Sequence, residues 1–303
     1  MKEKKGLLKN WKDYPANPLI NPPFPGILLG DPSVVPPDES PDGAWHLFAN
    51  TILAIHHYTS RDGINWRRIR RVFPGMRAYV YREGETYFLL CEEFQIPMFK
   101  SHIVIRTSKD LSIWSEKKII LKAETPWEKR LGHTCGNPCL IKNGDMYFLY
   151  YSAGLVFLRD LGFCEPLHIG LAKAPDIYGP YEKSAQPIIS PSPAEPYRNL
   201  GAGAIKVIQI PQIEGFVGFN NGIYSDEEGG TRSAILALHS HDGIQWRKMY
   251  EEPVISPGGP AWKRALVYQL DVTRVENEMW LYYNARSGWR FGRECIGLAT
   301  CSL

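Results

Sequence analysis

The sequence predicts an all-β fold, a five-bladed β-propeller of four-stranded antiparallel blades. The first observation is a recurring phrase, a polar turn around an aspartate that ends on an aromatic residue. Three close copies occupy residues 59–66, 107–114 and 239–246, and a weaker copy occupies 172–181. Each copy follows an apolar, β-rich run, so it marks a strand, a tight turn and an outer strand. Such repetition indicates an array of similar supersecondary units.

The second observation is a pair of apolar, aromatic runs in each repeat. The pairs lie within residues 77–90, 137–151, 204–219 and 268–283. The joining segments 82–85 and 142–145 contain glycine or asparagine, which accept the positive φ angles of hairpin turns. Each repeat is therefore expected to form four antiparallel strands.

Four-stranded units arranged radially form a propeller, which leaves only short and protected sheet edges. A solenoid is the structural alternative, but a stack of such blades would expose its end sheets. We expect one domain over residues 1–303, with a closing segment at 1–28. The expected blades lie at about residues 29–73, 75–121, 133–192, 200–258 and 265–303.

The fifth blade ends on its third strand, at residues 294–300. Its outer strand is therefore expected from the N-terminal segment, which would close the ring. Residues 17–22, with Leu19 and Ile20 at the centre, resemble the segments 187–191 and 253–257 that complete blades three and four.

Composition excludes several classes of function. The net charge is +3 with 22% charged residues, so nothing favours nucleic acid, and the basic run 67–71 fits the charged edge of an outer strand. No apolar run approaches membrane length. The basic N-terminus has no apolar signal core, and the six cysteines lack metal-finger spacing. We expect a cytoplasmic protein with reduced thiols and no organic cofactor.

Polar residues that begin the innermost strands of a propeller point toward its axis. In chain order these are Asp31, Arg77, Asn137, the small stretch 201–203, and Gln269 with Asp271 nearby. Aromatic residues, Tyr268 among them, lie close to these positions in the sequence. A pocket with polar groups and flat aromatic faces suits a sugar, which has hydroxyl edges and apolar C–H faces.

The segment Leu29–Val35, with Asp31 before proline, resembles the first-blade motif of the five-bladed propeller glycoside hydrolases of families 43, 32 and 130. The closing strand 296–300 is similar to strands that end family 130 enzymes. The resemblance covers the whole chain as architecture and implies a glycosidase acting on a small glycoside or an oligosaccharide end. It also implies that Asp31 is the general base of an inverting reaction.

The chain departs from the family 43 pattern at two places. Asn137 stands where the second aspartate is expected, and residues 201–203 offer no carboxylate where the general acid is expected. Inverting hydrolysis needs a second carboxyl group about 6.5–9.5 Å from the base. The candidates for the acid are Glu92, Glu93 and Glu195, followed by Asp271. His133 could donate a proton or bind substrate.

Two other functions stay open. One is a sugar-binding propeller without catalysis. The other is phosphorolysis or glycosyl transfer, for which Arg77 would be joined by Arg130, Arg198 or Arg264 at a phosphate site. An axial calcium ion also stays open, although no ligand cluster demands it. The insertions 155–163 and 225–230 are expected to shape the rim, and the first is apolar enough for a lid or a dimer contact.

Overall fold

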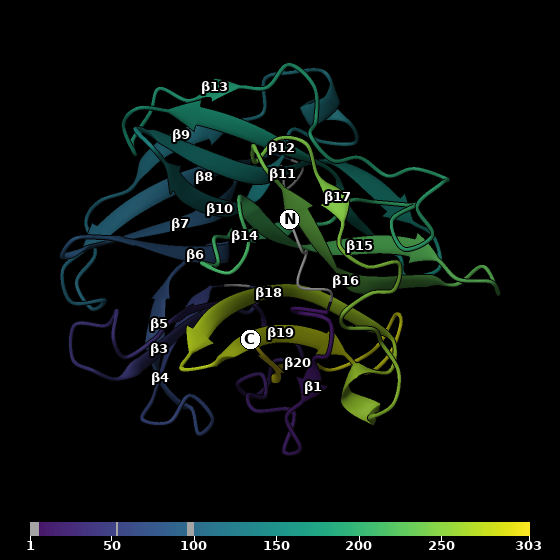
Figure 1. Cartoon of the computed structure of the whole chain (residues 1–303), viewed down its shortest axis with the longest axis horizontal. Coiled ribbons are helices and arrows are strands. Elements are labelled where there is room, and N and C mark those ends of the chain that lie inside the picture. Colours follow the sequence, from purple (N-terminus) through teal and green to yellow (C-terminus); the bar gives the residue numbers. More distant parts are fainter. Residues whose placement is uncertain (1–5, 53, 96–99) are drawn as a thin grey trace.

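The computed structural model describes residues 6–52, 54–95 and 100–303. The chain forms five four-stranded antiparallel sheets. Their innermost strands follow one another around a closed ring, β2–β6–β10–β14–β18 and back to β2. Figure 1 shows β6, β10, β14 and β18 gathered near the middle of the molecule. The predicted five-bladed propeller is therefore confirmed.

Each blade runs from its innermost to its outermost strand in the same order. Blade one contains β2 (Gly30–Val35), β3 (Trp45–Asn50), β4 (Ile55–Ser60) and β5 (Arg67–Phe73). Blade two contains β6 (Met76–Glu83), β7 (Thr86–Gln95), β8 (Lys100–Ser108) and β9 (Lys118–Lys122). Blade three contains β10 (Cys135–Asn143), β11 (Met146–Leu158), β12 (Phe163–Ala174) and β13 (Glu182–Lys183).

Blade four contains β14 (Ile205–Ile208), β15 (Phe216–Ser225), β16 (Thr231–Ser240) and β17 (Arg247–Lys248). Blade five contains β18 (Leu266–Val275), β19 (Glu278–Arg286), β20 (Glu294–Ser302) and, from the other end of the chain, β1 (Lys12–Asp13). Two short 3₁₀ turns, η1 (Trp127–Lys129) and η2 (Ala261–Lys263), precede blades three and five.

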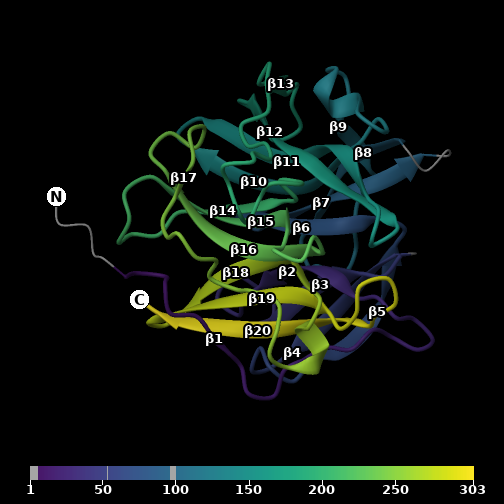
Figure 2. The same cartoon turned by 90° about the vertical axis from the view of Figure 1, so that its right-hand side faces the viewer.

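The N-terminal segment closes the ring, as the sequence predicted. Strand β1 pairs antiparallel with β20 as the outermost strand of blade five, and Figure 2 shows the two side by side. Ile20 also bridges Ile296. Blades three and four have equivalent bridges, Ile189 to Ile169 and Ile255 to Ile235. The segment around Ile20 thus fills the place predicted for it, while the outer strand itself lies at residues 12–13.

The recurring phrase is a turn that aspartate organises. Asp62 Oδ1 accepts hydrogen bonds from the backbone N–H groups of Ile64 and Asn65, at 2.9 and 2.8 Å. Asp110 and Asp242 make the same pair of contacts in their own turns. These backbone hydrogen bonds lower the pKa of all three carboxyls. The repeat is therefore conserved within the chain because each blade needs the same tight connection to its outer strand.

The core lies between the blades. One large buried cluster joins blades four and five through residues such as Phe219, Leu281 and Tyr283. Tyrosine hydroxyls link other pairs of blades. Tyr282 of blade five donates to the carbonyl of Gly63 in blade one at 2.8 Å, and Tyr150 of blade three donates to that of Gly243 in blade four at 2.9 Å. Each pair joins two neighbouring blades.

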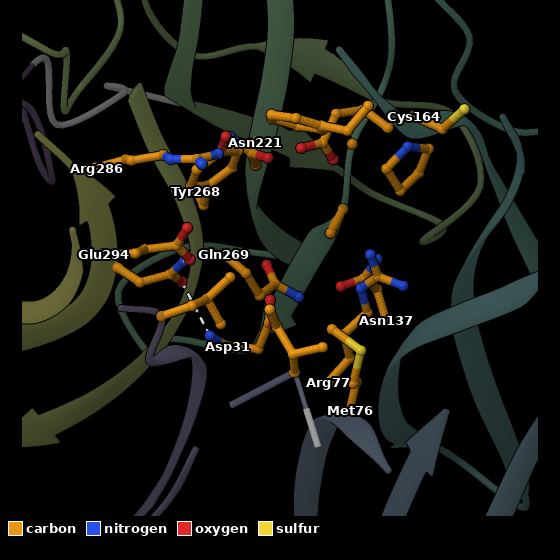
Figure 3. A pocket seen from close by; sticks show the side chains of 18 residues that line it. Asp31, Met76, Arg77, Asn137, Cys164, Asn221, Tyr268, Gln269, Arg286 and Glu294 are labelled. Atoms are coloured by element: carbon orange, nitrogen blue, oxygen red, sulfur yellow. Dashed lines mark hydrogen bonds between the residues drawn. The ribbon is translucent and has the colours of Figure 1, made fainter. Parts of the chain in front are cut away.

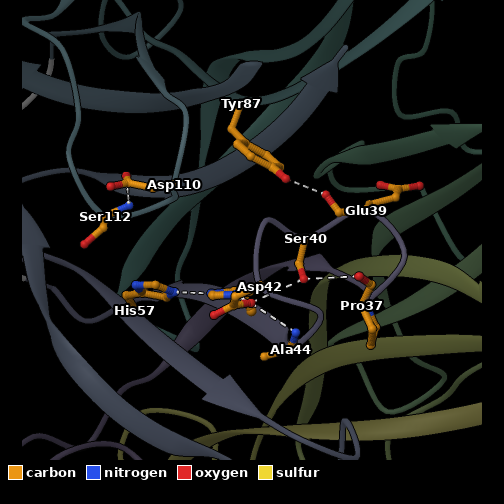
Figure 4. Close-up of polar contacts among 10 residues, drawn as sticks. Pro37, Glu39, Ser40, Asp42, Ala44, His57, Tyr87, Asp110 and Ser112 are labelled. Atoms are coloured by element: carbon orange, nitrogen blue, oxygen red, sulfur yellow. Dashed lines mark hydrogen bonds and ion pairs between the residues drawn. The ribbon is translucent and has the colours of Figure 1, made fainter. Parts of the chain in front are cut away.

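Loop 36–44, between β2 and β3, is held by polar contacts with its neighbours (Figure 4). The Tyr87 hydroxyl of blade two donates to the carbonyl of Glu39 at 2.7 Å. Asp42 accepts the N–H of Ala44 and lies 2.8 Å from a ring nitrogen of His46, whose other ring nitrogen lies 2.8 Å from His57. Burial lowers the pKa of His57 to about 3, so His57 is uncharged at neutral pH.

Leu8 offers a test of the closure. Its side chain is fully buried in the cluster between blades four and five, although it belongs to the N-terminal segment. We expect Leu8→Ala to lower the free energy of unfolding by about 2–5 kcal/mol, measured by urea unfolding. The matched control is Lys12→Ala at an exposed position of the same segment. Equal stabilities of Leu8→Ala and wild type would contradict closure by this segment.

Candidate active site

The innermost strands share a kink where each one begins. The pairing register shifts between Gly30 and Ser33 in blade one, and at the equivalent place in blades two, three and five. Within the kink, Asp31, Arg77 and Asn137 have positive φ angles of 53°, 56° and 48°. Non-glycine residues adopt this conformation rarely and at an energetic cost. A kink of this kind re-aims side chains, and all three of these side chains line one axial cavity.

Blade four places glycine at the same position. Gly203 has a φ of 57°, and a Cβ atom there would come within 2.0 Å of the Asn221 carbonyl oxygen. No larger residue fits without moving the backbone. The chain therefore leaves blade four without a side chain at this position, and Gly203 and Asn221 both line the cavity there.

Polar side chains near the ends of the second strands fix the kinked segments of the following blades. Asn284 of β19 accepts the N–H of Asp31 at 3.0 Å, and Asn50 of β3 accepts the N–H of Arg77 at 2.6 Å. Ser152 of β11 donates to the Gly203 carbonyl at 2.6 Å. Asn221 of β15 donates to the carbonyl of Val267 at 3.0 Å. The rim of the cavity is thus held by hydrogen bonds that pass from blade to blade.

The cavity has a volume of about 330 Å³, near the lower end of the usual range for small-molecule sites. Figure 3 shows side chains converging on it from all around the axis. Its charged lining residues are Asp31, Glu165, Glu294, Arg77 and Arg286. Its amide lining residues are Asn137, Asn221, Gln269 and Asn284. Tyr268, Phe163, Met76, Leu28 and Ile52 supply aromatic and apolar surface.

Asp31 lies on the cavity wall beside a cation. Burial raises the pKa of its carboxyl, while the Arg77 guanidinium and the Asn50 side chain oppose this shift and Glu92 adds to it. Burial outweighs the opposing effects, so the net shift of this pKa is upward. This is the environment of a carboxylate that can exchange a proton.

Arg77 is held by Glu92. The guanidinium Nη1 and the Glu92 Oε2 are 2.5 Å apart, and the Glu92 side chain is almost fully buried. Burial opposes protonation of Arg77, but the charges of Glu92 and Asp31 outweigh it and raise its pKa. Glu92 thus neutralises Arg77 and orients it, and it lies behind the cavity wall instead of in it.

Glu165 reaches the cavity from an extended hairpin. Strands β11 and β12 pair as far as Leu158 and Phe163, so the insertion predicted to shape the rim forms the end of this hairpin. Phe163, Cys164 and Glu165 follow its tip and line the cavity. Burial raises the pKa of Glu165 to about 7, with Arg77 opposing the shift and Asp31 adding to it. This carboxyl is half protonated near neutral pH.

Glu294 begins strand β20 and is buried against blade one. Its Oε1 accepts a hydrogen bond from the Asn284 side chain at 2.5 Å. A Cβ atom on Gly30 would lie 2.7 Å from the same oxygen, so glycine before Asp31 makes room for this carboxyl. Burial and the charge of Asp31 raise the pKa of Glu294 to about 8, against the effect of Arg286. Glu294 is therefore mostly protonated at neutral pH.

Five of the residues predicted from the sequence line the cavity together. They are Asp31, Arg77, Asn137, Tyr268 and Gln269. Asp271 lies deeper, where it accepts the N–H of Val34 at 2.8 Å and faces the Lys206 ammonium at 3.7 Å. It joins blades one, four and five below the cavity. The roles assigned to all these residues stay predictions.

The other predicted residues lie away from the cavity lining. Glu93 pairs with Arg106 and Lys117 on the opposite side of β7 from Glu92. Glu195 faces Lys248 at 3.6 Å. The carbonyl of His133 accepts the N–H of Ser101 at 2.9 Å beside strand β8. The acid candidates Glu92, Glu93 and Glu195 are thus each paired with a cationic side chain, and none of the three lines the cavity.

Sequence reasoning passed over Glu165, Glu294 and Arg286. Glu165 was available as a carboxylate followed by proline at the end of an apolar insertion. Glu294 opens a third strand, a position that the axial argument did not cover, and Arg286 ends the strand before it. A search for charged residues at every strand end on the cavity side would have found the last two.

Among residues 6–52, 54–95 and 100–303, no group of three or more His, Cys, Asp or Glu side chains is placed to hold a metal ion. The described part of the chain also contains no helix long and apolar enough to cross a membrane.

Proteins of known structure that share this fold are named for different reactions on sugars. The catalytic domain of a GH62 α-L-arabinofuranosidase from Coprinopsis cinerea has a TM-score of 0.71 at 14% identity, with 96% of each chain covered. A β-1,2-mannobiose phosphorylase from Listeria innocua, solved with β-1,2-mannobiose, has a TM-score of 0.67 at 15% identity and 97% coverage of each chain.

An N-acetylgalactosamine deacetylase from F. plautii, solved with blood group B trisaccharide, has a TM-score of 0.66 at 14% identity, with 97% of this chain and 94% of that chain covered. No family model and no curated protein matches the sequence. At these identities the likeness shows the fold, and the resemblance to five-bladed propeller glycoside hydrolases is confirmed at that level.

Glu294 gives a stability test. Its pKa is raised from 4.5 to about 8, so the folded protein binds this proton more tightly than the unfolded chain does. From this group alone, the free energy of unfolding falls by roughly 1.4 kcal/mol for each pH unit between those two values. Glu294→Gln keeps an oxygen for Asn284 but cannot ionise.

We therefore expect Glu294→Gln to unfold at higher urea concentration than wild type near pH 8, with a much smaller difference near pH 5. Glu93→Gln is the control, because Glu93 is a carboxylate paired outside the cavity. A Glu294→Gln effect of the same size at both pH values would show that Glu294 ionises normally in the folded protein.

Proposed function

We propose that this protein cleaves the terminal glycosidic bond of a small glycoside or oligosaccharide, with Asp31 as general base and Glu165 as general acid. The observation that carries the proposal is the pairing of two carboxyls with different environments in one axial cavity. Asp31 lies beside the Arg77 cation, and Glu165 has a pKa of about 7. Two carboxyls held in different surroundings within one cavity are typical of acid–base pairs in catalysis.

Asp31 is the candidate base because several neighbours stabilise its anion, although burial raises its pKa overall. Arg77, Asn50 and Lys206 all lower its pKa against the effect of burial. Its backbone is fixed by Asn284, so the carboxylate has a defined place on the wall. In the proposed reaction it accepts a proton from water while the water oxygen forms a bond to the anomeric carbon.

Glu165 suits the acid because it holds a proton near neutral pH and is free to give it up. Among the described residues no group forms a hydrogen bond with the Glu165 side chain, whereas the Glu294 side chain accepts a hydrogen bond from Asn284. The Glu165 proton moves to the glycosidic oxygen as the bond from that oxygen to the anomeric carbon breaks. Glu165 is left as an anion, Asp31 is left protonated, and a proton passes back through solvent to restore both.

The cavity lining supports a sugar unit as the occupant. Four amide side chains offer both donors and acceptors, and Tyr268 and Phe163 offer aromatic faces. A volume of about 330 Å³ favours an end unit over the middle of a long chain. The sugar-active proteins that share the fold are consistent with this use of the axis.

Phosphorolysis is the second candidate, since one protein with this fold is a phosphorylase. Of the arginines considered for a phosphate site, Arg77 lines the cavity, whereas Arg130, Arg198 and Arg264 are not among its lining residues. Arg77 is already paired with Glu92. These two facts favour water over phosphate as the attacking group.

Asp31→Asn tests the base. The substitution keeps the size of the side chain and one acceptor oxygen but removes its charge. We expect kcat to fall by about 10²- to 10⁴-fold on whichever substrate emerges from a screen of aryl glycosides and oligosaccharides, assayed with and without phosphate. Glu93→Gln, on the outer face of β7, should retain wild-type turnover. Turnover of Asp31→Asn at the wild-type rate would remove Asp31 from the mechanism.

Glu165→Gln tests the acid through pH and leaving group. Because the acid must be protonated, kcat/KM of the wild type should be high below about pH 7 and fall as pH rises through the pKa of Glu165. In Glu165→Gln this alkaline limb should disappear. Turnover should fall about 10²- to 10⁴-fold for alkyl glycosides and much less for nitrophenyl glycosides, which need no proton on departure.

The same series on Glu294→Gln distinguishes the two carboxyls. If Glu294→Gln shows the leaving-group dependence and Glu165→Gln does not, the acid is Glu294, and the assignment of Glu165 is wrong.

A further inference from the structure

Arg286 is a cation of the cavity whose charge no described carboxylate meets at close range. It ends strand β19 and lines the cavity. One of its terminal nitrogens donates to the carbonyl of Arg290 at 3.1 Å, and its guanidinium lies 5.3 Å from the centre of the Phe163 ring. Within the described chain, no Asp or Glu oxygen lies within 4 Å of it. Arg77, in contrast, is paired with Glu92.

The carboxyls nearest to Arg286 do not supply the missing charge. Glu165 and Glu294 both interact with Arg286 through space, but burial raises their pKa values to about 7 and about 8. Near neutral pH one is half protonated and the other mostly protonated. A guanidinium in a partly desolvated wall without a full counter-charge is costly. That cost is relieved when an anion binds.

Two hydrogen-bond donors at this end of the cavity meet no acceptor. The Nε of Arg286 and the hydroxyl of Tyr268 are both buried and donate to no acceptor among the described residues. The two side chains interact with each other, and the hydrogen bond with Arg286 lowers the pKa of Tyr268 against the larger effect of burial. Tyr268 is itself buried and lines the cavity. Figure 3 shows Arg286 and Tyr268 on the same side of the cavity as Glu294, across from Arg77 and Asn137. Buried donors of this kind are normally satisfied.

We propose that the sugar unit bound in this cavity carries a carboxylate, which Arg286 and Tyr268 bind. The inference rests on the proposed function for the identity of the ligand as a sugar, and it adds the class of that sugar, a uronic acid. A guanidinium binds a carboxylate through two parallel N–H groups, and the tyrosine hydroxyl supplies a third donor. Arg77 and Asn137 lie across the cavity from this pair.

The arrangement selects against neutral sugars. A hydroxymethyl group in place of the carboxylate would leave Arg286 without a counter-charge. The single oxygen of the hydroxymethyl group would accept hydrogen bonds from only some of the donors of Arg286 and Tyr268. Discrimination of this kind comes from polar groups of the site left unpaired with the wrong ligand.

Direct binding tests the proposal without requiring turnover. Glucuronate, galacturonate, glucose, galactose and inorganic phosphate are titrated into wild type and into Asp31→Asn, followed by ligand-observed NMR and calorimetry near pH 7. We expect a uronate to bind more tightly than its neutral counterpart in both proteins. In Arg286→Gln the affinity for the uronate should fall roughly 10- to 100-fold, while the affinity for the neutral sugar changes little.

Two further variants define the role of the charge and of the hydroxyl. Arg286→Lys should keep part of the preference, because an ammonium retains the charge but not the paired N–H groups. Tyr268→Phe should weaken uronate binding by a smaller factor. Arg264→Gln is the matched control, since Arg264 is an exposed arginine of the same blade outside the cavity. Thermal melts of each variant verify folding.

Equal binding of acidic and neutral sugars, or no saturable binding of any sugar, overturns the proposal. It is also overturned if the preference survives Arg286→Gln, or if phosphate alone shows the dependence on Arg286. Uronate binding that depends on Arg286, together with an absence of turnover on aryl uronides, would keep the carboxylate site and refute the hydrolase. Turnover confined to neutral glycosides would support the hydrolase and refute the carboxylate site.

Discussion

A series of hydrogen bonds between neighbouring blades, interrupted only between blades two and three of the described chain, is the constraint on which the cavity depends. In blades one, three, four and five, a polar residue near the end of the second strand forms a hydrogen bond with the start of the next blade's inner strand. In that order, these residues are Asn50, Ser152, Asn221 and Asn284. In blade two the equivalent residue is Glu92, which binds the Arg77 side chain instead. The kinks at Asp31, Arg77 and Asn137 require unfavourable φ angles, and at Asp31 and Arg77 the cross-blade contacts offset part of that cost.

The closed ring of blades explains the electrostatics of the site. Because the blades close tightly around the axis, carboxyls that enter the cavity lose water, and burial dominates their pKa values. Nearby cations oppose this effect of burial: Arg77 does so at Asp31 and Glu165, and Arg286 does so at Glu165 and Glu294. A deeper ion pair between Lys206 and Asp271, at 3.7 Å, lies beneath the cavity. Its carboxylate also receives the N–H of Val34, which supports strand β2 a few residues from Asp31.

The sequence predicted the parts of this site that follow from repetition. Once the blades were recognised, the start of each inner strand had to face the axis, and Asp31, Arg77, Asn137 and Gln269 do line the cavity. What repetition could not supply were residues that only one blade contributes. Glu165 depends on the length and direction of the β11–β12 hairpin, and Glu294 on the space left by a glycine in another blade. In the sequence, Glu92 has the position expected of a catalytic acid at a strand end. Its pairing with Arg77 depends on the tertiary structure and could not be predicted from the sequence.

The seam between the last blade and the first has a consequence for the order of synthesis. Asp31 belongs to the first blade that the ribosome makes, whereas the side chains that fix and flank it, Asn284 and Glu294, belong to the last. The outermost strand of that final blade is in turn borrowed from the amino terminus. A chain that ended before Asn284 would lack both of these side chains, so the surroundings of Asp31 are complete only when the last blade has been made.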